Sequence, residues 1–314
     1  MFHISLPSLR KHGSSSSEGG GMWYYHVIAF IIVTIWGGTL VSSKLLIQAG
    51  MAEHEIFIAR ALIAYVAIWP FAPGKLWART WRDELLFLFI GMLGGSLYFI
   101  LENFAVGLTL VNNVSFIVSL SPLITVFLAR LFWKGMRLST MLLTGSAIAV
   151  VGVGLIIYGG QTDSCGQDNL WGDILALLSA LCFGIYSLLV KVLGKGYSST
   201  FITRKLFAYG FLTALPWLLA MPWQFEFARF LQADVLFNLL FLALVASFGC
   251  FLMWNVTVGK LGAVVTSNYI YVSPIATVVI SYLFLGEQMC LLAYIGSAAV
   301  LLGVIIANKD MCDC

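Results

Sequence analysis

The chain has 314 residues, of which 61% are hydrophobic and 10% are charged, with a formal net charge of +3 and a mean hydropathy of +0.96. These values lie outside the range of soluble globular proteins. A membrane-spanning helix needs about 20 apolar residues, so such spans would use nearly the whole chain and leave no room for a soluble catalytic domain.

Residues 1–22 contain the Ser/Gly-rich stretch HGSSSSEGGG and are predicted to form a disordered cytoplasmic tail. The apolar tract that follows is too long for the core of a signal peptide, so we expect an uncleaved first helix. Ten spans are predicted, at 24–47, 54–72, 85–106, 111–132, 139–158, 172–193, 200–221, 235–257, 263–285 and 289–307. A short cytoplasmic tail, 309–314, ends the chain. The sequence thus predicts an all-α integral membrane protein with ten transmembrane helices.

The chain repeats itself along its length. Residues 57–65 read FIARALIAY and residues 201–209 read FITRKLFAY, which agree at six of nine positions. Likewise SPLITV at 121–126 matches SPIATV at 273–278, and GSAIAVVG at 145–152 matches GSAAVLLG at 296–303. We therefore predict two five-helix repeats, 23–160 and 170–308. Because five is odd, the second repeat must enter the membrane from the opposite side, which gives the inverted symmetry of many transporters.

The distribution of Lys and Arg predicts the orientation. With a cytoplasmic amino terminus, twelve of these residues fall on inner connectors, whereas the outer connectors receive Arg229 alone. This is a positive-inside bias. Both termini are therefore expected in the cytoplasm, with the protein in the inner or plasma membrane.

The motifs resemble those of the drug/metabolite transporter superfamily, specifically its EamA-type members. The resemblance rests on Trp36-Gly37 with Lys44, on the Arg60 and Arg204 tracts, on the two Ser-Pro segments and on the Leu-Phe-Leu-Gly-Glu that ends at Glu287. It implies ten helices around a central cavity lined largely by the first, third, fourth, sixth, eighth and ninth helices. It also implies transport of small metabolites, often amino acids and commonly outward.

Glu102 is the acidic residue well inside a predicted span, where ionisable groups are costly and usually functional. Gly91, Gly95 and Tyr98 precede it at helical spacing, which places all four on one predicted helix face. Glu102 is therefore a candidate substrate ligand and proton carrier. The alternative is a structural pairing with Lys44 or Arg60 near the outer interface.

Other polar and aromatic residues are candidates for the substrate-binding cavity. Ser115 and Ser119 lie on one face of the fourth span, and Ser267 and Tyr271 repeat this spacing in the ninth. The remaining candidates are the aromatic residues Trp36, Tyr186 and Trp254 and the amide residues Asn103, Asn255 and Asn268. Helix packing and interfacial anchoring are the alternatives for these residues.

Four basic residues are expected at the two mouths of the cavity: Lys44 and Arg60 on the outer side, and Lys191 and Arg204 on the inner side. They are candidates to attract anionic substrates. Snorkelling to the interface is the alternative. The tracts around the two arginines are not themselves expected to form the binding site.

Neither a metal site nor a catalytic constellation is predicted. The four histidines lie in the tail or near helix ends, and no nucleophile, zinc or phosphate-loop motif is present. The six cysteines suggest no disulfide framework, and the Cys312–Cys314 pair is too small for a metal site. We expect no cofactor, and as partners a small-molecule substrate, the lipid bilayer and protons, but no nucleic acid. The sequence leaves the oligomeric state open.

These observations favour a secondary transporter that moves a small organic metabolite by alternating access, with Glu102 as the candidate for coupling to protons. An amino acid or related compound, exported, is the substrate that the resemblance implies. Antiport of a sugar phosphate or nucleotide sugar is the alternative within transport. A non-coupled, channel-like or structural membrane protein is the alternative outside it.

Overall fold

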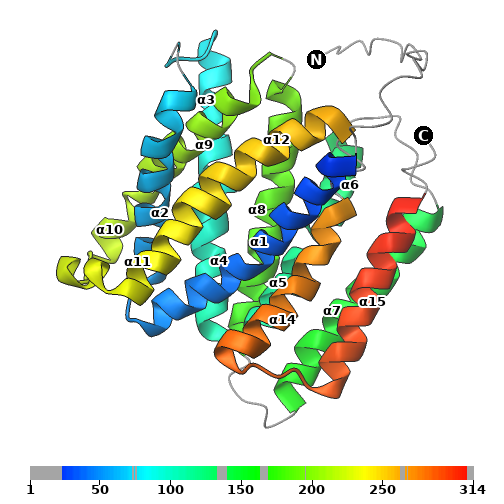
Figure 1. Cartoon of the computed structure of the whole chain (residues 1–314). Coiled ribbons are helices and arrows are strands. Elements are labelled where there is room, and N and C mark those ends of the chain that lie inside the picture. The colour runs from blue at the N-terminus through cyan, green and yellow to red at the C-terminus, as the bar shows by residue number, and fades with distance from the viewer. Residues whose placement is uncertain are drawn as a thin grey trace, which may run out of the picture.

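The computed structural model describes residues 23–72, 74, 76–132, 140–162, 169–194, 196–261, 266 and 268–309. Every regular element within these residues is a helix (Figure 1). The first repeat comprises α1 (Trp23–Gln48), α2 (Glu53–Ile68), η1 (Trp69–Phe71), α3 (Trp81–Gly91), η2 (Met92–Ser96), α4 (Leu97–Leu108), α5 (Val111–Val118), α6 (Ser121–Phe132) and α7 (Thr140–Thr162). The predicted tails, 1–22 and 309–314, lie outside the described residues except for Lys309, which ends α15.

The second repeat follows the same order. It comprises α8 (Leu170–Leu193), α9 (Ser199–Ala214), α10 (Trp217–Ala220), η3 (Phe227–Leu231), α11 (Ala233–Leu240), η4 (Phe241–Gly249), α12 (Cys250–Leu261), η5 (Asn268–Val272), α14 (Ser273–Leu285) and α15 (Leu291–Lys309). Joined end to end, the helices of both repeats form ten rods within the described residues. Six of them are long and apolar enough to cross a membrane, which identifies a multi-pass integral membrane protein.

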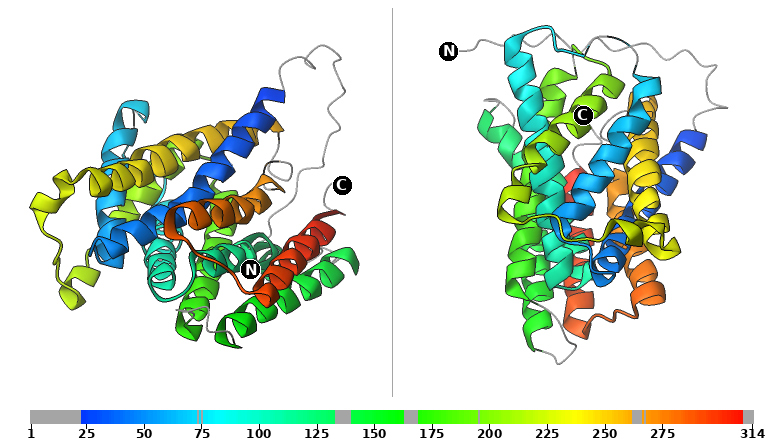
Figure 2. Two further views of the ribbon diagram at one scale, coloured as in Figure 1. Left: turned by 60° about the horizontal axis from the view of Figure 1, so that its bottom comes forward. Right: turned by 90° about the vertical axis from the view of Figure 1, so that its left-hand side faces the viewer.

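The packing between the repeats has two-fold symmetry. Helix α1 of the first repeat packs on α14 and α12 of the second repeat. Its counterpart α8, in the second repeat, packs on the equivalent helices α6 and α4 of the first repeat. The pairs α7 with α15 and α2 with α9 each join a helix to its own counterpart, so they lie on the axis of that symmetry. Figures 1 and 2 both show α7 and α15 side by side at one edge of the bundle. The predicted inverted pair of five-helix repeats is confirmed.

Glycines bring the two axial helices α7 and α15 into close contact. A Cβ built on Gly152 would lie 2.6 Å from the carbonyl oxygen of Gly296, and one on Gly296 would lie 2.6 Å from that of Gly152. A Cβ on Gly303 would lie 2.5 Å from the Gly145 carbonyl oxygen, which is the repeat-related contact. Only residues without a Cβ allow backbones to approach this closely.

Two pairs of irregular segments interrupt the helices at repeat-related depths. The fourth rod breaks between α5 and α6 at Ser119, just before Ser121-Pro122, and the ninth changes from η5 to α14 at Ser273-Pro274. A proline has no N–H to continue the helical ladder, so a break at each site is expected. The third and eighth rods instead contain π-helical turns, η2 and η4.

The π turns correct one sequence prediction. Gly91, Gly95, Tyr98 and Glu102 were expected on one face, but Gly91 and Gly95 pack against Gly210 of α9, whereas Tyr98 and Glu102 line a cavity. The reason is that each wider π turn inserts a residue, which rotates everything after it around the helix axis.

The seventh rod and several boundaries also differ from the prediction. The expected span 200–221 divides into α9 and α10, because the chain turns at Leu215 and Pro216. The third and eighth rods extend beyond the predicted 85–106 and 235–257, since polar residues at their ends remain helical. The start of the predicted ninth span, 263–265, lies outside the described residues.

Candidate functional site

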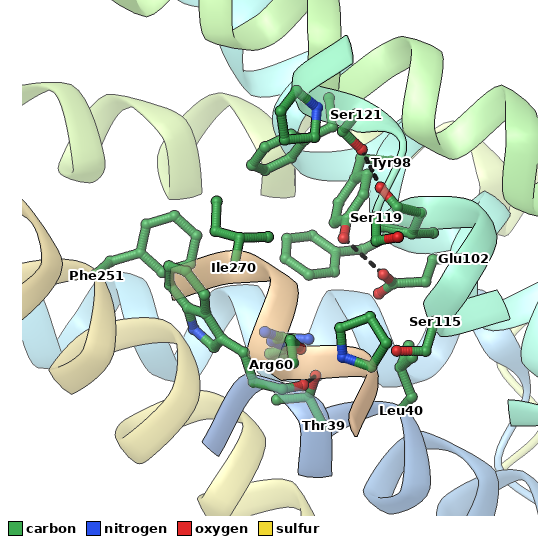
Figure 3. A pocket seen from close by; sticks show the side chains of 17 residues that line it. Thr39, Leu40, Arg60, Tyr98, Glu102, Ser115, Ser119, Ser121, Phe251 and Ile270 are labelled. Atoms are coloured by element: carbon green, nitrogen blue, oxygen red, sulfur yellow. Dashed lines mark hydrogen bonds between the residues drawn. The ribbon is translucent and has the colours of Figure 1, made fainter. Parts of the chain in front are cut away.

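A cavity of about 120 Å³ lies between the repeats (Figure 3). Side chains from the rods expected from the resemblance line it, and α2 adds Arg60. The lining residues are Trp36, Thr39, Leu40, Arg60, Tyr98, Phe99, Glu102, Ser115, Val118, Ser119, Ser121, Pro122, Phe183, Phe251, Ile270, Ser273 and Pro274. Both Ser-Pro breaks are among them, so the irregular backbone lines a cavity rather than facing lipid.

Glu102 is one of the two charged residues in this lining. The Tyr98 hydroxyl, one turn earlier on α4, donates a hydrogen bond to Glu102 Oε1 at 2.6 Å (Figure 3). Neither of the predicted structural partners binds Glu102 directly: Lys44 donates to the Val106 carbonyl at 2.6 Å, and Arg60 donates to Ser247. A buried carboxylate that faces a cavity and is held by one hydroxyl is able to accept a cationic group or a proton.

Arg60 is the second charged residue of the lining, which corrects its expected place at the outer mouth. Its Nε donates to the Ser247 hydroxyl at 2.5 Å, and its guanidinium lies 4.2 Å from the centre of the Phe99 ring. The helix pair α2 and η4 brings Arg60 inward, so it does not reach the interface. Its tract therefore forms part of the cavity, contrary to expectation.

Hydroxyl groups line the wall made by the two broken rods. Ser115 bonds with Thr277 across the repeat boundary at 2.9 Å, and Thr277 also donates to the Gly37 carbonyl at 2.9 Å. Ser119 donates to the Phe116 carbonyl at 2.6 Å. These bonds join α1, α5 and α14, which come from both repeats, and leave the serine oxygens as further acceptors.

Aromatic rings form another part of the lining. Trp36 lies on the lining, its indole N–H donates to the Ala246 carbonyl at 3.2 Å, and its ring lies 5.4 Å from Phe251. Trp254 packs behind Trp36 at 5.0 Å between ring centres and is not in the lining. The cavity therefore combines one cation and one carboxylate with hydroxyls and an aromatic surface.

Three other predicted cavity residues lie elsewhere. Asn103 donates to the Glu53 carbonyl at 2.9 Å and joins α4 to the start of α2. The Tyr186 ring packs against Gly94, in the space that a Cβ would occupy, and Tyr271 is buried in the apolar core. In each case the helix rotation that the fold imposes points the side chain toward a neighbouring helix.

The predicted mouth charges Lys44 and Arg204 are buried helix-to-helix contacts. Lys44 binds the carbonyl end of α4, and Arg204 donates to the Ala72 carbonyl at 2.6 Å. Neither side chain snorkels to the interface. Ser267 lies outside the described residues, as do the side chains of Asn255, Asn268 and Lys191.

Sequence reasoning missed several lining residues. Phe99 and Phe251 are repeat-related, 152 positions apart, and this spacing was a usable signal. Phe183, Thr39 and Ile270 carried no signal that separates them from ordinary span residues. Ser247, which binds Arg60 but is not in the lining, was also missed, because only the fold brings η4 against α2.

No metal site is formed by the residues that the structure describes, since no group of three His, Cys, Asp or Glu side chains gathers there. Cys182 and Cys250 are free thiols within helices, and Cys290 is a free thiol just before α15. Cys165, Cys312 and Cys314 fall outside the described ranges.

A family profile described as the EamA-like transporter family matches residues 23–158 and again 170–309. The two matches coincide with the two repeats. A protein described as a probable terminal-alkyne amino-acid exporter, from Streptantibioticus cattleyicolor, is 27% identical over 83% of this chain and 85% of its own length.

Two other similarities extend over most of the chain. An uncharacterised transporter of Archaeoglobus fulgidus is 24% identical over 89% of this chain and 96% of its own. A solved crystal structure superposes with a TM-score of 0.60 at 15% identity, covering 91% of this chain and 96% of that one. At that identity the superposition shows a shared fold.

Proposed function

Because the chain belongs to the EamA-like transporter family, we propose that it is a secondary transporter that moves a small organic metabolite across the membrane by alternating access. The favoured substrate is an amino acid or a related compound, and the favoured direction is export. The observation that carries the proposal is the cavity itself. Both repeats line it, so an exchange of conformation between the two repeats would open it to one side and then the other.

The charges of the lining support a substrate without net charge. Arg60 and Glu102 are its charged residues, and their charges sum to zero. An amino acid carries one cationic and one anionic group, which matches this pair. The aromatic rings in the lining, Trp36, Phe183 and Phe251, suit an apolar side chain, and the relative from Streptantibioticus cattleyicolor is named as an amino-acid exporter.

The same charges argue against a sugar phosphate or nucleotide sugar. A phosphate group carries close to two negative charges at neutral pH. A single arginine opposed by a carboxylate offers it no net attraction, whereas phosphate sites usually gather several donors or cations. This alternative is therefore disfavoured.

Coupling to protons follows from Glu102. A proton on its carboxylate and the ammonium group of a substrate would occupy the same site, so they would compete. Competition for one carboxylate makes each species leave before the other binds, which couples proton entry to substrate exit.

Both termini are proposed to face the cytoplasm, as the positive-inside bias predicts. Labelling of single cysteines introduced at Arg79 and Gln232 in intact cells tests this orientation.

The proposal is tested with purified protein in proteoliposomes, using labelled amino acids at several concentrations with and without a pH gradient. We expect saturable flux, counterflow when unlabelled substrate is present on the other side, and stimulation by a proton gradient. Flux that neither saturates nor shows counterflow would identify a channel and overturn the carrier.

A further inference from the structure

We propose that Arg60 is the anchor for the substrate's carboxylate and that Ser247, from the other repeat, is the positioning residue that holds Arg60 in place. This inference rests on the proposed function and adds to it how the site recognises its substrate. The pair crosses the repeat boundary, so the anion site is complete only when α2 and η4 are packed together.

The hydrogen bonds of Arg60 leave part of its guanidinium available. Its Nε is used by Ser247, and its face lies over Phe99. Within the described residues, its two terminal nitrogens have no hydrogen-bond partner, and the side chain belongs to the cavity lining (Figure 3). Those two nitrogens form the planar fork that binds a carboxylate through two parallel hydrogen bonds.

Glu102 completes the site, three residues after Phe99 on α4, the ring on which the Arg60 guanidinium packs. The direct ion pair among the described residues joins Lys205 to Glu84, so Arg60 and Glu102 form no direct ion pair with each other. Tyr98 holds one oxygen of Glu102, and the second oxygen has no partner there. A zwitterion placed between the two residues would satisfy both charges at once.

The repeat-related arginine shows why Ser247 matters. Arg204 occupies the position equivalent to Arg60, but it binds the Ala72 carbonyl and does not line the cavity. The residue equivalent to Ser247 is Gly95, 152 positions earlier, which has no hydroxyl to offer. Of the two related arginines, the one that binds Ser247 is thus the one that lines the cavity.

The π-helical backbone of η4 orients Ser247 toward Arg60. Ser247 lies within the π-helical segment and is fully buried. A π turn changes the direction of the side chains in it and after it. Ser247 therefore points at α2, where a neutral hydroxyl can fix the guanidinium without neutralising its charge, which stays available to an anion.

The test compares three related molecules: L-phenylalanine, its amide, which lacks the carboxylate, and 3-phenylpropionate, which lacks the amine. The phenyl group suits the aromatic rings in the lining. Thermal stabilisation of the purified protein in detergent measures binding, and counterflow in proteoliposomes measures transport. We expect Ser247→Ala to raise the KM for phenylalanine about tenfold, a typical loss for one hydrogen bond to a charged group, with little change in kcat.

The other variants separate positioning from general damage. Ser247→Thr keeps the hydroxyl and should restore the wild-type KM. Arg60→Lys should weaken the binding of phenylalanine and 3-phenylpropionate but not the binding of the amide. Ser96→Ala is the matched control, because Ser96 is a buried serine of the other π segment that bonds Thr213 and lies outside the lining. It should leave the KM unchanged.

The two proposals fail differently. The proposal that Arg60 anchors the carboxylate is overturned if Ser247→Ala weakens the binding of the amide as much as the binding of phenylalanine. It is also overturned if neither phenylalanine nor 3-phenylpropionate stabilises the wild-type protein. The transporter is overturned if phenylalanine and the wider amino-acid panel bind to the wild-type protein but are not moved. In that case, loss of the thermal stabilisation in Ser247→Ala would still support the anchor.

Discussion

Single side chains make the cavity asymmetric although the backbone around it is symmetric. The repeat-related counterpart of Glu102 is Trp254, that of Tyr98 is Cys250, and that of Ser247 is Gly95. A symmetric site would carry two carboxylates or none. The exchange of a few side chains therefore turns two similar repeats into one site with a single carboxylate.

Glu102→Gln tests the carboxylate. The amide keeps the shape and the hydrogen bond with Tyr98 but neither ionises nor takes up a proton. We expect flux driven by a pH gradient to fall at least tenfold, while exchange of substrate for substrate is partly retained. Counterflow and gradient-driven uptake in proteoliposomes measure the two quantities.

Glu53→Gln is the matched control for that experiment, since Glu53 is a carboxylate at the start of α2 outside the cavity lining. It should leave both fluxes unchanged. Normal, pH-sensitive flux in Glu102→Gln would make the role of Glu102 structural.

At the scale of elements, the irregular segments position the site. The π turns η2 and η4 and the two Ser-Pro breaks occur in repeat-related pairs, and all four segments either line the cavity or precede residues that do. The breaks were predictable, because proline cannot continue the helical ladder. The π turns were not, because their residues carry no comparable signal.

Gly152→Ala tests the close packing of α7 on α15. The added Cβ would lie 2.6 Å from the Gly296 carbonyl oxygen and 2.7 Å from the Val300 nitrogen, so the backbones must separate. We expect a loss of about 1–3 kcal/mol in stability, as for other overpacked sites, seen as a lower thermal midpoint in detergent.

Gly154→Ala is the control on the same helix. No atom lies within 4 Å of a Cβ built there, so the substitution should be neutral or slightly stabilising through helix propensity. If both variants lose the same stability, the Gly152 contact does not hold α7 against α15.

At the scale of the whole molecule, contacts between the repeats are what alternating access must break and remake. One such contact joins the start of α3 to the middle of α9: Glu84 accepts hydrogen bonds from the Lys205 ammonium and the Tyr209 hydroxyl. The Glu84 and Lys205 side chains are buried, and the Ala78 amide also donates to Glu84, at 2.6 Å. The Glu84–Lys205 ion pair therefore links the first repeat to the second at a place outside the cavity lining.

Lys205→Met tests this tie. It removes the cation and leaves Glu84 buried without its charge partner, which typically costs several kcal/mol. We expect a marked fall in the thermal midpoint, and a partial recovery when Glu84→Gln is added, because the unpaired charge is then gone. A double variant no more stable than Lys205→Met would rule out the ion pair as the cause.

The sequence by itself determined the membrane class, the ten helices and the inverted repeats, because apolar length and internal similarity are properties of the chain that need no contacts. It also indicated five cavity residues: Trp36, Tyr98, Glu102, Ser115 and Ser119. Only the tertiary structure decided that Arg60 lines the cavity, that Tyr186 and Tyr271 do not, and that Ser247 reaches Arg60. The physical reason is that the rotation of each helix about its axis depends on π turns, breaks and packing against distant helices, which local spacing does not specify.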